Sequence, residues 1–265
     1  MANIRTANIT ILLAVGLLGC ALGQAAAAVR VEGQVQAGGG PIAISTVTLW
    51  AASAVEPRQL AQAKTDGGGR FVLDTQETVA SDVILYVIAK GGEAQAIRGS
   101  GDNPAIALVS LLGNTPPANV VINEMTTVAS VWTANQFIDG MAIKGHVLGL
   151  KIAAGNVPSF VDIQTGGWGT TIQDSLNGGQ TPTMANFATL VDLLAGCATR
   201  VKADACAKLF AASIPPKGNA PTDTLTAAQA IARYPWYQPE RVFRLLDEFY
   251  PIPAGKTMRA VPFMP

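Results

Sequence analysis

The chain has 265 residues, of which 14% are charged, and its 18 lysines and arginines balance its 18 aspartates and glutamates. Because this balance comes without a basic cluster, the composition argues against nucleic acid as a partner and against binding to an anionic membrane surface. A single histidine, His146, excludes multi-histidine zinc or iron sites.

The N-terminus carries the pattern of an export signal. Arg5 precedes a short apolar run at 9–22, and a small-residue tract ends in an Ala-x-Ala sequence at 26–28. Signal peptidases recognise these three parts, and the run is shorter than the roughly 20 residues of a membrane-spanning helix. We therefore predict a signal peptide over residues 1–28 and a secreted or periplasmic protein. A retained N-terminal anchor helix is the alternative.

A second cleavage site lies within the same segment. Leu17-Leu18-Gly19-Cys20 resembles a bacterial lipobox, in which cleavage occurs before the cysteine and the cysteine carries lipid. Under this hypothesis Cys20 anchors the protein in the membrane as a lipoprotein. We expect no other contact with the membrane.

Residues 29–122 have the pattern of β-strands. Apolar and polar residues alternate with a period near two in four runs, at 29–35, 47–50, 70–73 and 83–88. Glycine-rich segments at 38–41 and 65–69 are predicted as turns. Neither segment opens a helix or carries the Lys-Ser/Thr of a phosphate-binding loop. We expect a small antiparallel β-sandwich, to which runs at 105–112 and 119–122 add strands.

Several motifs within residues 29–95 resemble those of a known family. They are Val31-x-Gly33-x-Val35, Gly40-Pro41-Ile42, Thr65-Asp66-x-x-Gly69-x-Phe71-x-Leu73 and Tyr86-Val87-Ile88-Ala89. Together they resemble the carboxypeptidase regulatory-like domain, a transthyretin-like or Ig-like sandwich. The resemblance implies a domain without catalytic residues that has a stabilising or adhesive role on exported proteins. Ile44 and Ser45 stand where this family usually has Gly-Ala, a departure that concerns the bend before the next strand.

After residue 122 the spacing of apolar residues changes to that of helices. Met125, Val128, Ala129 and Trp132 fall near i, i+3, i+4 and i+7, with Asn123 placed as the N-cap. Further helices are predicted at 143–154, 183–199, 205–213, 224–232 and 238–250. We expect residues 123–250 to form an all-α domain, which makes the fold class α+β. Its helical core should contain Leu190, Leu193, Leu194, Leu225, Ala228, Ile231, Val242, Phe243, Leu246 and Phe249.

Cys197 and Cys206 are nine residues apart, near the facing ends of two predicted helices. Disulfides persist in exported proteins, so we predict a bridge between these two cysteines. Closing so short a loop stabilises a protein by about 2 to 3 kcal/mol in the chain-entropy model. A metal or redox pair is the alternative, although no other soft ligand lies nearby in the sequence and the spacing is not Cys-x-x-Cys.

The second half also has familiar motifs. They are Asn123-Glu124-Met125-Thr126-Thr127-Val128-Ala129, Ala153-Ala154-Gly155-Asn156-Val157, Leu193-Leu194-Ala195-Gly196-Cys197 with Cys206-x-x-Leu209-Phe210, and Pro221-x-Asp223-Thr224-x-x-Ala227-Ala228. They resemble a helical segment that, in large exported bacterial proteins, follows a regulatory-like sandwich and precedes an NHL-repeat propeller. The resemblance covers residues 104–250 and, through its two cysteines, also supports the disulfide. We expect the Pro-rich stretch 251–265 to be a linker, which fits either a fragment or a truncated gene product without its propeller.

Polar residues offer few candidates for catalysis. His146 lies in an apolar stretch that we expect to be helical, so we interpret it as a packed or surface histidine rather than a catalytic one. Asp192 with Glu248, or Asp223 with Glu240, could approach each other in the fold. Nothing in their spacing pairs them, and we interpret all four as members of solvated helix faces.

Two aromatic segments are the candidate ligand or docking surfaces. Trp168 lies in a Gly-rich loop, where it could stack on a flat ligand, although plugging the core is the more common role. Tyr234, Trp236 and Tyr237 join two predicted helices and could pack on the sandwich or receive a propeller domain.

These observations predict a protein that is not an enzyme and that has no catalytic residues, cofactor or metal. We expect a non-catalytic structural or accessory module at the bacterial cell envelope, with an envelope protein or a propeller domain as its partner. The alternative is the N-terminal part of a larger NHL-type propeller protein, similar to streptogramin lyase or gluconolactonase. Any lyase or lactonase activity would then belong to the missing domain.

Overall fold

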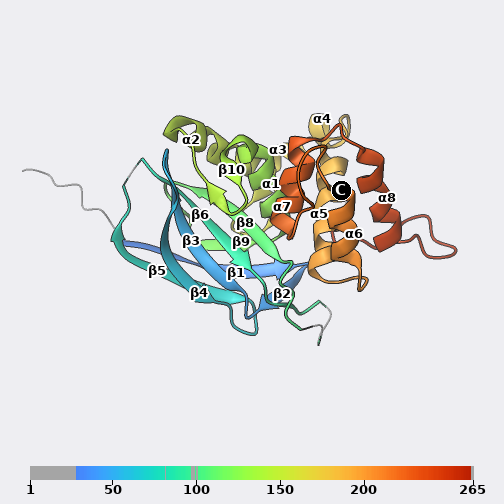
Figure 1. Ribbon diagram of the computed structural model, residues 1–265, viewed down its shortest axis with the longest axis horizontal. Coiled ribbons are helices and arrows are strands. Elements are labelled where there is room, and N and C mark those ends of the chain that lie inside the picture. The colour runs from blue at the N-terminus through green and yellow to red at the C-terminus, as the bar shows by residue number, and fades with distance from the viewer. Residues whose placement is uncertain (1–27, 81, 97–98, 100, 264–265) are drawn as a thin grey trace, which may run out of the picture.

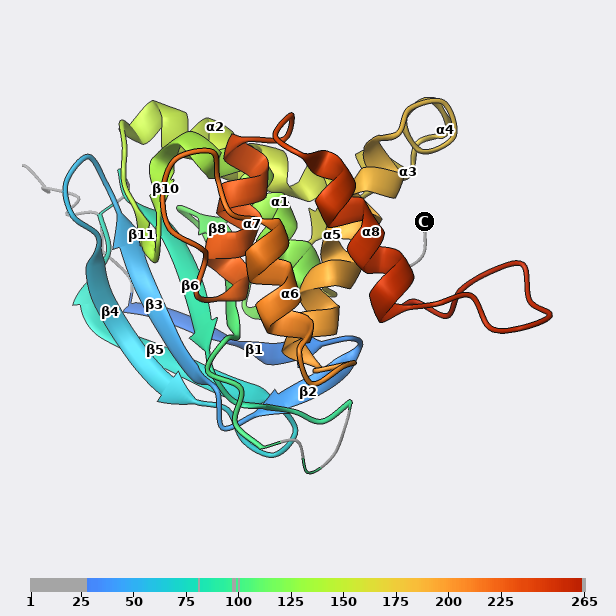
Figure 2. The same cartoon turned by 45° about the vertical axis from the view of Figure 1, so that its right-hand side comes forward.

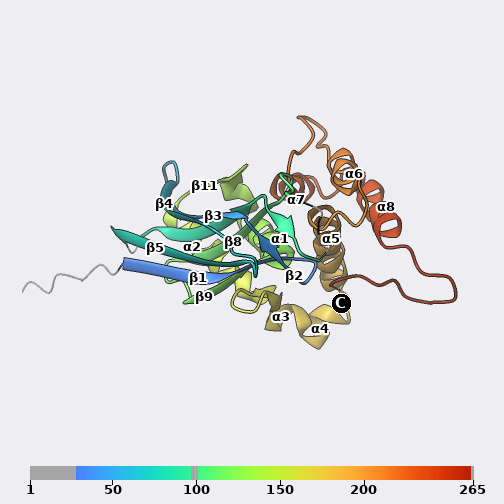
Figure 3. The ribbon, with the colours of Figure 1, turned by 90° about the horizontal axis from the view of Figure 1, so that it is seen from below.

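The computed structural model describes residues 28–80, 82–96, 99 and 101–263, and it has the expected α+β fold. The predicted signal peptide and Cys20 lie outside the described residues. Two β-sheets and a group of helices follow one another in layers, with the sheets at one side of Figure 1 and the C-terminal helices at the other. Figure 3 shows the same order from below.

The first sheet contains the N-terminal strand β1 (Ala28–Ala37). The order of its main path is β5-β1-β2-β7, with β2 (Gly40–Ala43), β5 (Arg70–Thr78) and β7 (Glu93–Ala94). These neighbours are antiparallel, whereas β9 (Asn119–Ile122) pairs with β1 in parallel, with Gly33 opposite Val120. A side chain at Gly33 does not fit, because its Cβ would lie 1.8 Å from the carbonyl oxygen of Val120.

The second sheet has the order β4-β3-β6-β8 and is antiparallel throughout. Its strands are β3 (Thr46–Ala52), β4 (Arg58–Lys64), β6 (Ile84–Lys90) and β8 (Ala107–Gly113). The two sheets bury an apolar core between them that includes Val31 and Leu73 from one sheet and Leu49, Val87 and Leu108 from the other. The predicted sandwich is therefore present.

Some strands and turns differ from the sequence-based expectation. Gly40 and Pro41 were expected in a turn but begin β2, so the turn between β1 and β2 is only Gly38-Gly39. Strand β4 was not predicted, because its sequence Arg-Gln-Leu-Ala-Gln-Ala-Lys is polar. The strand lies at the edge of the sheet, where its residues are partly or fully exposed. Ile44, between β2 and β3, has a φ of +54°, a conformation that favours glycine.

The helical part contains eight α-helices among the described residues. Their bounds are α1 Glu124–Ala134, α2 Val147–Asn156, α3 Thr170–Gln173, α4 Ser175–Gly178, α5 Thr183–Ala198, α6 Ala205–Ala212, α7 Thr224–Arg233 and α8 Pro239–Phe249. Two short hairpins interrupt them, β10 (Ile138–Asp139) with β11 (Ala142–Ile143) and β12 (Val161–Asp162) with β13 (Gly167–Trp168). The helix expected at 143–154 begins only at Val147, because Ile143 belongs to β11.

N-cap side chains fix the start of two helices. The Asn123 side chain accepts a hydrogen bond from the backbone of Thr126, and the Thr126 hydroxyl accepts one from the backbone of Asn123. Asp223 and Thr226 form the same reciprocal pair at the start of α7. Such pairs satisfy backbone donors that a helix leaves free, which is why the predicted starts are confirmed.

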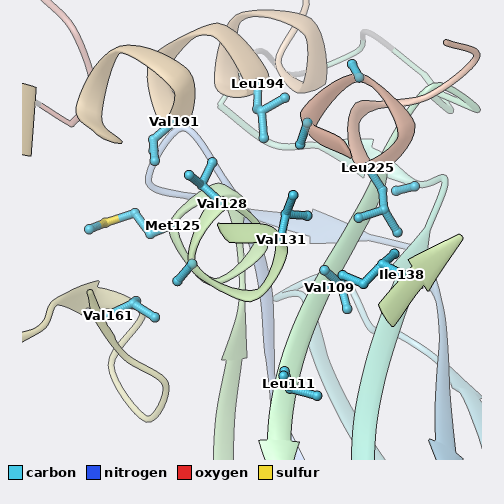
Figure 4. Packing of buried hydrophobic residues seen from close by; sticks show 14 of the residues in the cluster. Val109, Leu111, Met125, Val128, Val131, Ile138, Val161, Val191, Leu194 and Leu225 are labelled. Carbon is cyan, nitrogen blue, oxygen red and sulfur yellow. The ribbon is translucent and has the colours of Figure 1, made fainter. Parts of the chain in front are cut away.

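The helices share their core with the second sheet instead of forming one of their own. A single apolar cluster joins Tyr86 and Val109 of this sheet to Val128 of α1 and Leu194 of α5. Figure 4 shows Val128 and Val131 between α5 and β8. Most of the expected helical core residues belong to this cluster, but 48% of Phe243 is exposed.

Hydroxyl groups of the helices bind the free edge of strand β8. Thr224 accepts a hydrogen bond from the backbone N–H of Ala107, Thr127 from that of Val109 and Ser130 from that of Leu111. Because these contacts satisfy alternate backbone groups, the second sheet ends at the helices and not at solvent.

The segment after α8 was expected to be a linker. It has no helix or strand up to Phe263, and it loops away from the body in Figure 2 before it returns to the helices. Arg259 pairs with Asp247 at 2.6 Å, and the backbone N–H of Phe263 donates to Asp192 at 3.0 Å. Val261 and Phe263 are partly buried against the core, so this end of the segment is packed on the protein.

Candidate functional site

A cavity of about 470 Å³ forms a groove among the helices. We call it the aromatic groove. It is lined by Trp132, Asn135, Phe160, Asn186, Leu190, Ala212, Ser213, Ile214, Pro215, Ala230, Ile231, Ala232, Tyr234, Pro235, Tyr237, Pro239, Val242 and Phe243. None of these lining residues is an Asp, Glu, Lys, Arg or His, so the groove offers aromatic and aliphatic surface with a few uncharged polar groups.

One wall of the groove is the corner between α7 and α8. The backbone N–H of Tyr237 donates to the carbonyl of Tyr234 at 2.9 Å, which closes the turn. Gln238 then takes a left-handed conformation with a φ of +52°, and Pro239 begins α8. This corner directs Tyr234 and Tyr237 to the groove, as the sequence suggested for a ligand or docking surface. Trp236 does not line the groove; 69% of it is exposed.

The opposite wall belongs to a cluster of packed aromatic rings. Trp132 meets Phe160 and Phe187 edge to face, with ring centroids 5.7 and 5.3 Å apart. Trp168 contacts Phe187 at 5.7 Å and is partly buried against the core. The structure therefore places Trp168 behind Phe187, in the core-plugging position, and not among the groove residues. Neither Trp132 nor Phe160 was a candidate from sequence, because only tertiary packing brings them to Tyr234.

Two buried carboxyl groups with raised pKa values are absent from the lining of the aromatic groove. Glu124 in the first turn of α1 is fully buried; its Oε1 accepts a hydrogen bond from Gly38 N–H at 3.1 Å, whereas its Oε2 has no partner in the described structure. Burial raises the pKa of Glu124 to about 8. Glu124 therefore anchors the turn between β1 and β2, and its burial favours the protonated form of the carboxyl group.

Asp192 on α5 is the second buried carboxyl group with a raised pKa, and 2% of the residue is exposed. Burial raises its pKa to about 6, and the hydrogen bond from Phe263 opposes that rise. The Tyr250 hydroxyl donates to the backbone carbonyl of Asp192 at 3.1 Å. Burial, together with the carboxyl groups of Asp192 and Glu124, raises the pKa of this tyrosine.

The expectation of four solvated acidic residues is wrong for two of them. Asp192 is buried, and Asp223 is the buried N-cap of α7. Glu248 is exposed and pairs with Lys208 at 2.8 Å, while Glu240 is exposed in the first turn of α8. A helical pattern could not show that the C-terminal segment covers Asp192.

The predicted disulfide joins Cys197 and Cys206, whose Cα atoms are 4.4 Å apart. It ties the end of α5 to the start of α6. The Asn103 side chain donates to the carbonyl oxygens of Cys197 and Ala198 at 3.0 and 3.1 Å. The bridge is therefore also bound to the loop before β8.

His146 is an exposed N-cap. Its Nδ1 accepts a hydrogen bond from the backbone N–H of Leu148 at 3.3 Å, so it precedes α2 instead of lying within a helix. Within the described ranges, no group of three or more His, Cys, Asp or Glu side chains is arranged to hold a metal ion. In that part of the chain, none of the helices combines the length and apolar character needed to cross a membrane.

Comparison with known proteins gives no family for this chain. No family model matches it, and no curated protein sequence does. Among solved structures, the chain has a likeness to a 9R-lipoxygenase from Cyanothece PCC8801, with 18% sequence identity and a TM-score of 0.23. The likeness covers 35% of this chain and 15% of the lipoxygenase chain.

Proposed function

We propose that the protein is a non-catalytic, exported module of the bacterial cell envelope, and that it acts by binding through the aromatic groove. The observation that carries this proposal is the separation between the groove and the buried carboxyl groups. A general acid or base must lie within hydrogen-bond reach of the bound substrate. Here the groove is lined by uncharged residues, and the carboxyl groups with raised pKa values hold the backbone of Gly38 and Phe263.

The positions of these groups along the helices support the same function. Glu124 is in the first turn of α1, whereas Trp132 and Asn135 reach the groove from the other end of that helix. The Asp192 carboxylate binds the backbone of the C-terminal segment. Both carboxyl groups therefore have structural contacts that account for their burial.

The disulfide supports export, because such bonds persist mainly in oxidising compartments. Mass spectrometry of the secreted or periplasmic fraction should find a mature N-terminus at Val29 or a lipidated Cys20. Recovery of the chain mainly from the cytosol, with Met1 retained, would contradict export.

The absence of catalysis is tested with the purified protein on panels of lactones, esters and glycosides, on which we expect no turnover. Turnover that is lost in His146→Ala, in a variant that keeps the melting temperature of the parent, would contradict the proposal. Turnover lost in Glu124→Gln under the same condition would contradict it equally.

The second candidate is the N-terminal part of a larger propeller protein. Trp236 and Phe243 favour it, since 69% and 48% of these large residues are exposed beside the groove, on a surface that a further domain could cover. Reading the genomic DNA downstream of Pro265 tests this candidate. Repeats of the type Gly-Ile-Ala-x-Asp-x-x-Gly-Asn-x-Trp-Val in the same frame would support it, and a stop codon would reject it.

A further inference from the structure

The size and lining of the aromatic groove define the chemistry of a ligand. A volume of about 470 Å³ lies within the range of roughly 300 to 1,000 Å³ that is typical of small-molecule sites. Trp132, Tyr234, Tyr237 and Phe243 present ring surface to it from three helical segments. Flat ligands pack well against such walls, because aromatic rings favour offset stacking and edge contacts.

The absence of charged side chains from the lining of the groove limits the class of ligand that can bind. No charged side chain is among its lining residues, so an ionised ligand would lose its water without gaining a partner of opposite charge. That loss costs more than apolar burial returns. The groove therefore favours a neutral ligand over an anion or cation of the same shape.

Polar groups at the groove can still bind part of a ligand. Asn186, an exposed residue of α5, also lines the groove, and its amide can accept or donate a hydrogen bond. Asn135 lines the wall formed by the end of α1, but its Oδ1 is buried from solvent and therefore also from a ligand in the groove. A ligand with one uncharged polar group can therefore bind Asn186 while its apolar part packs on the rings.

From these features we propose that the aromatic groove binds a neutral, flat, largely apolar small molecule that carries one uncharged hydrogen-bonding group. The proposal rests on the function proposed above, and it adds the ligand class. Such a ligand would lie between the corner of Tyr234 and Tyr237 and the end of α1.

The test uses two fluorescent probes with the same ring skeleton. N-phenyl-1-naphthylamine is neutral and has one N–H group, and 8-anilino-1-naphthalenesulfonate adds a sulfonate to that skeleton. We expect the neutral probe to bind the purified protein saturably, with one site per chain. Its Kd should be about tenfold lower than that of the sulfonate, because the sulfonate has no cationic partner in the groove.

Matched variants locate the binding site. Phe243→Ala removes a half-exposed ring from the groove wall, whereas Trp236→Ala removes a more exposed ring outside it. We expect several-fold weaker binding of the neutral probe in Phe243→Ala and no change in Trp236→Ala. Ala232→Phe, which fills the groove from α7, should abolish binding, and melting curves of all three variants establish that they are folded.

Three results would overturn the ligand class. Tighter binding of the sulfonate would show that Lys217 and Arg233, which line an adjoining pocket at Tyr234, determine the affinity. Equal binding by Phe243→Ala and Trp236→Ala would place the probe elsewhere. A concentration-dependent dimer in sedimentation that is lost in Phe243→Ala would make a second copy of the chain the occupant.

The experiment also separates this inference from the function on which it rests. If the neutral probe fails to bind and the enzyme panels show no turnover, the ligand class is wrong and the non-catalytic function stands. If the probe binds and a panel shows turnover that Phe243→Ala removes, the ligand class stands and the non-catalytic function is wrong.

Discussion

The hydroxyl oxygen of Thr127 on α1 lies 3.0 Å from the backbone nitrogen of Val109 on β8 and accepts its hydrogen bond. The same hydroxyl is 2.7 Å from the backbone carbonyl oxygen of Asn123, to which it donates. One side chain therefore satisfies the edge of the sheet and the first turn of the helix together. Through this contact the helical layer closes an edge at which another chain could otherwise pair.

Thr127→Val should test the importance of that contact. The variant keeps the shape of the side chain but leaves the Val109 N–H buried without an acceptor, which costs about 1 to 3 kcal/mol. We expect a correspondingly lower free energy of unfolding in urea titrations. Thr133→Val is the control, because the Thr133 hydroxyl bonds only to carbonyl groups of its own helix and should matter little. Equal stability of the two variants would show that the edge contact contributes nothing.

The disulfide should contribute measurably to stability. Cys197→Ser opens a loop of short span, and the chain-entropy model gives a loss of about 2 to 3 kcal/mol. For a protein of this size, each 1 kcal/mol corresponds to a shift of about 2 to 4 °C in melting temperature. The melting temperature of the reduced parent, measured by calorimetry, should match that of Cys197→Ser under oxidising conditions. Free thiols in the native oxidised parent, measured with Ellman's reagent, would contradict the bridge.

The buried carboxyl group of Glu124 should make stability fall as pH rises. Its pKa rises from 4.5 to about 8 on folding, so between these pH values the folded state binds more protons than the unfolded state. The free energy of unfolding must then decrease over this window, by about 1 kcal/mol per pH unit, and level off above pH 8. Asp192 adds a similar decrease, but only between pH 3.8 and about 6.

Glu124→Gln isolates this effect, because the amide cannot titrate and its oxygen can still accept from Gly38. Between pH 6 and pH 8 the parent should lose stability relative to the variant. Urea titrations at several pH values measure the difference. Glu240→Gln, which makes the same substitution at an exposed residue in the first turn of α8, is the matched control. A parallel pH dependence of Glu124→Gln and the parent would refute the raised pKa.

Asp192 should hold the C-terminal segment against α5 and so protect it from proteases. Asp192→Ala removes the acceptor that holds the Phe263 N–H, so the segment should separate from α5 more often. We expect trypsin to cleave after Arg259 several-fold faster, as followed by mass spectrometry. Asp247→Asn removes only the exposed partner of Arg259 and should have a smaller effect. Equal cleavage rates in the parent and Asp192→Ala would exclude this role.

Ile44 offers a test of backbone strain. At a φ of +54° a β-branched residue is strained, and with 56% of it exposed it has little packing to lose. Ile44→Gly should therefore raise the free energy of unfolding by up to about 1 kcal/mol, despite the greater flexibility of glycine in the unfolded chain. Val55→Gly, at an exposed residue with negative φ, should not stabilise the protein. A destabilised Ile44→Gly would contradict the strain.

Local signals in the sequence were sufficient for much of the fold. Asn123 and Asp223 define helix starts by short-range hydrogen bonds, and the cysteine spacing defines the disulfide. The polar strand β4 was missed because its exposed residues lack an alternating pattern, although it pairs with β3 over its length apart from a register shift at Leu60. The hairpins between the helices are too short to produce a periodic signal.

The functional groups depended on tertiary contacts that a sequence does not display. Tyr234 and Tyr237 were identified from their clustering, but Trp132 and Phe160 join them only after α1 has packed against α7 and against the segment that precedes Phe160. The burial of Glu124 was not predicted, since nothing near it in the sequence shows that the Gly38 turn closes over it. Asp192 was misread for the same reason, because the segment that covers it lies 71 residues away.

Strands β6 and β8 are buried on both faces, one against the first sheet and the other against the helices. A ribosome makes the sheets first, so until α5 and α7 have been synthesised one face of these strands has no cover. During that interval the growing chain exposes a broad apolar sheet surface. Holding chaperones would bind to this surface, and aggregation would begin there. Premature termination after residue 122 should therefore yield an insoluble product and not a stable sandwich.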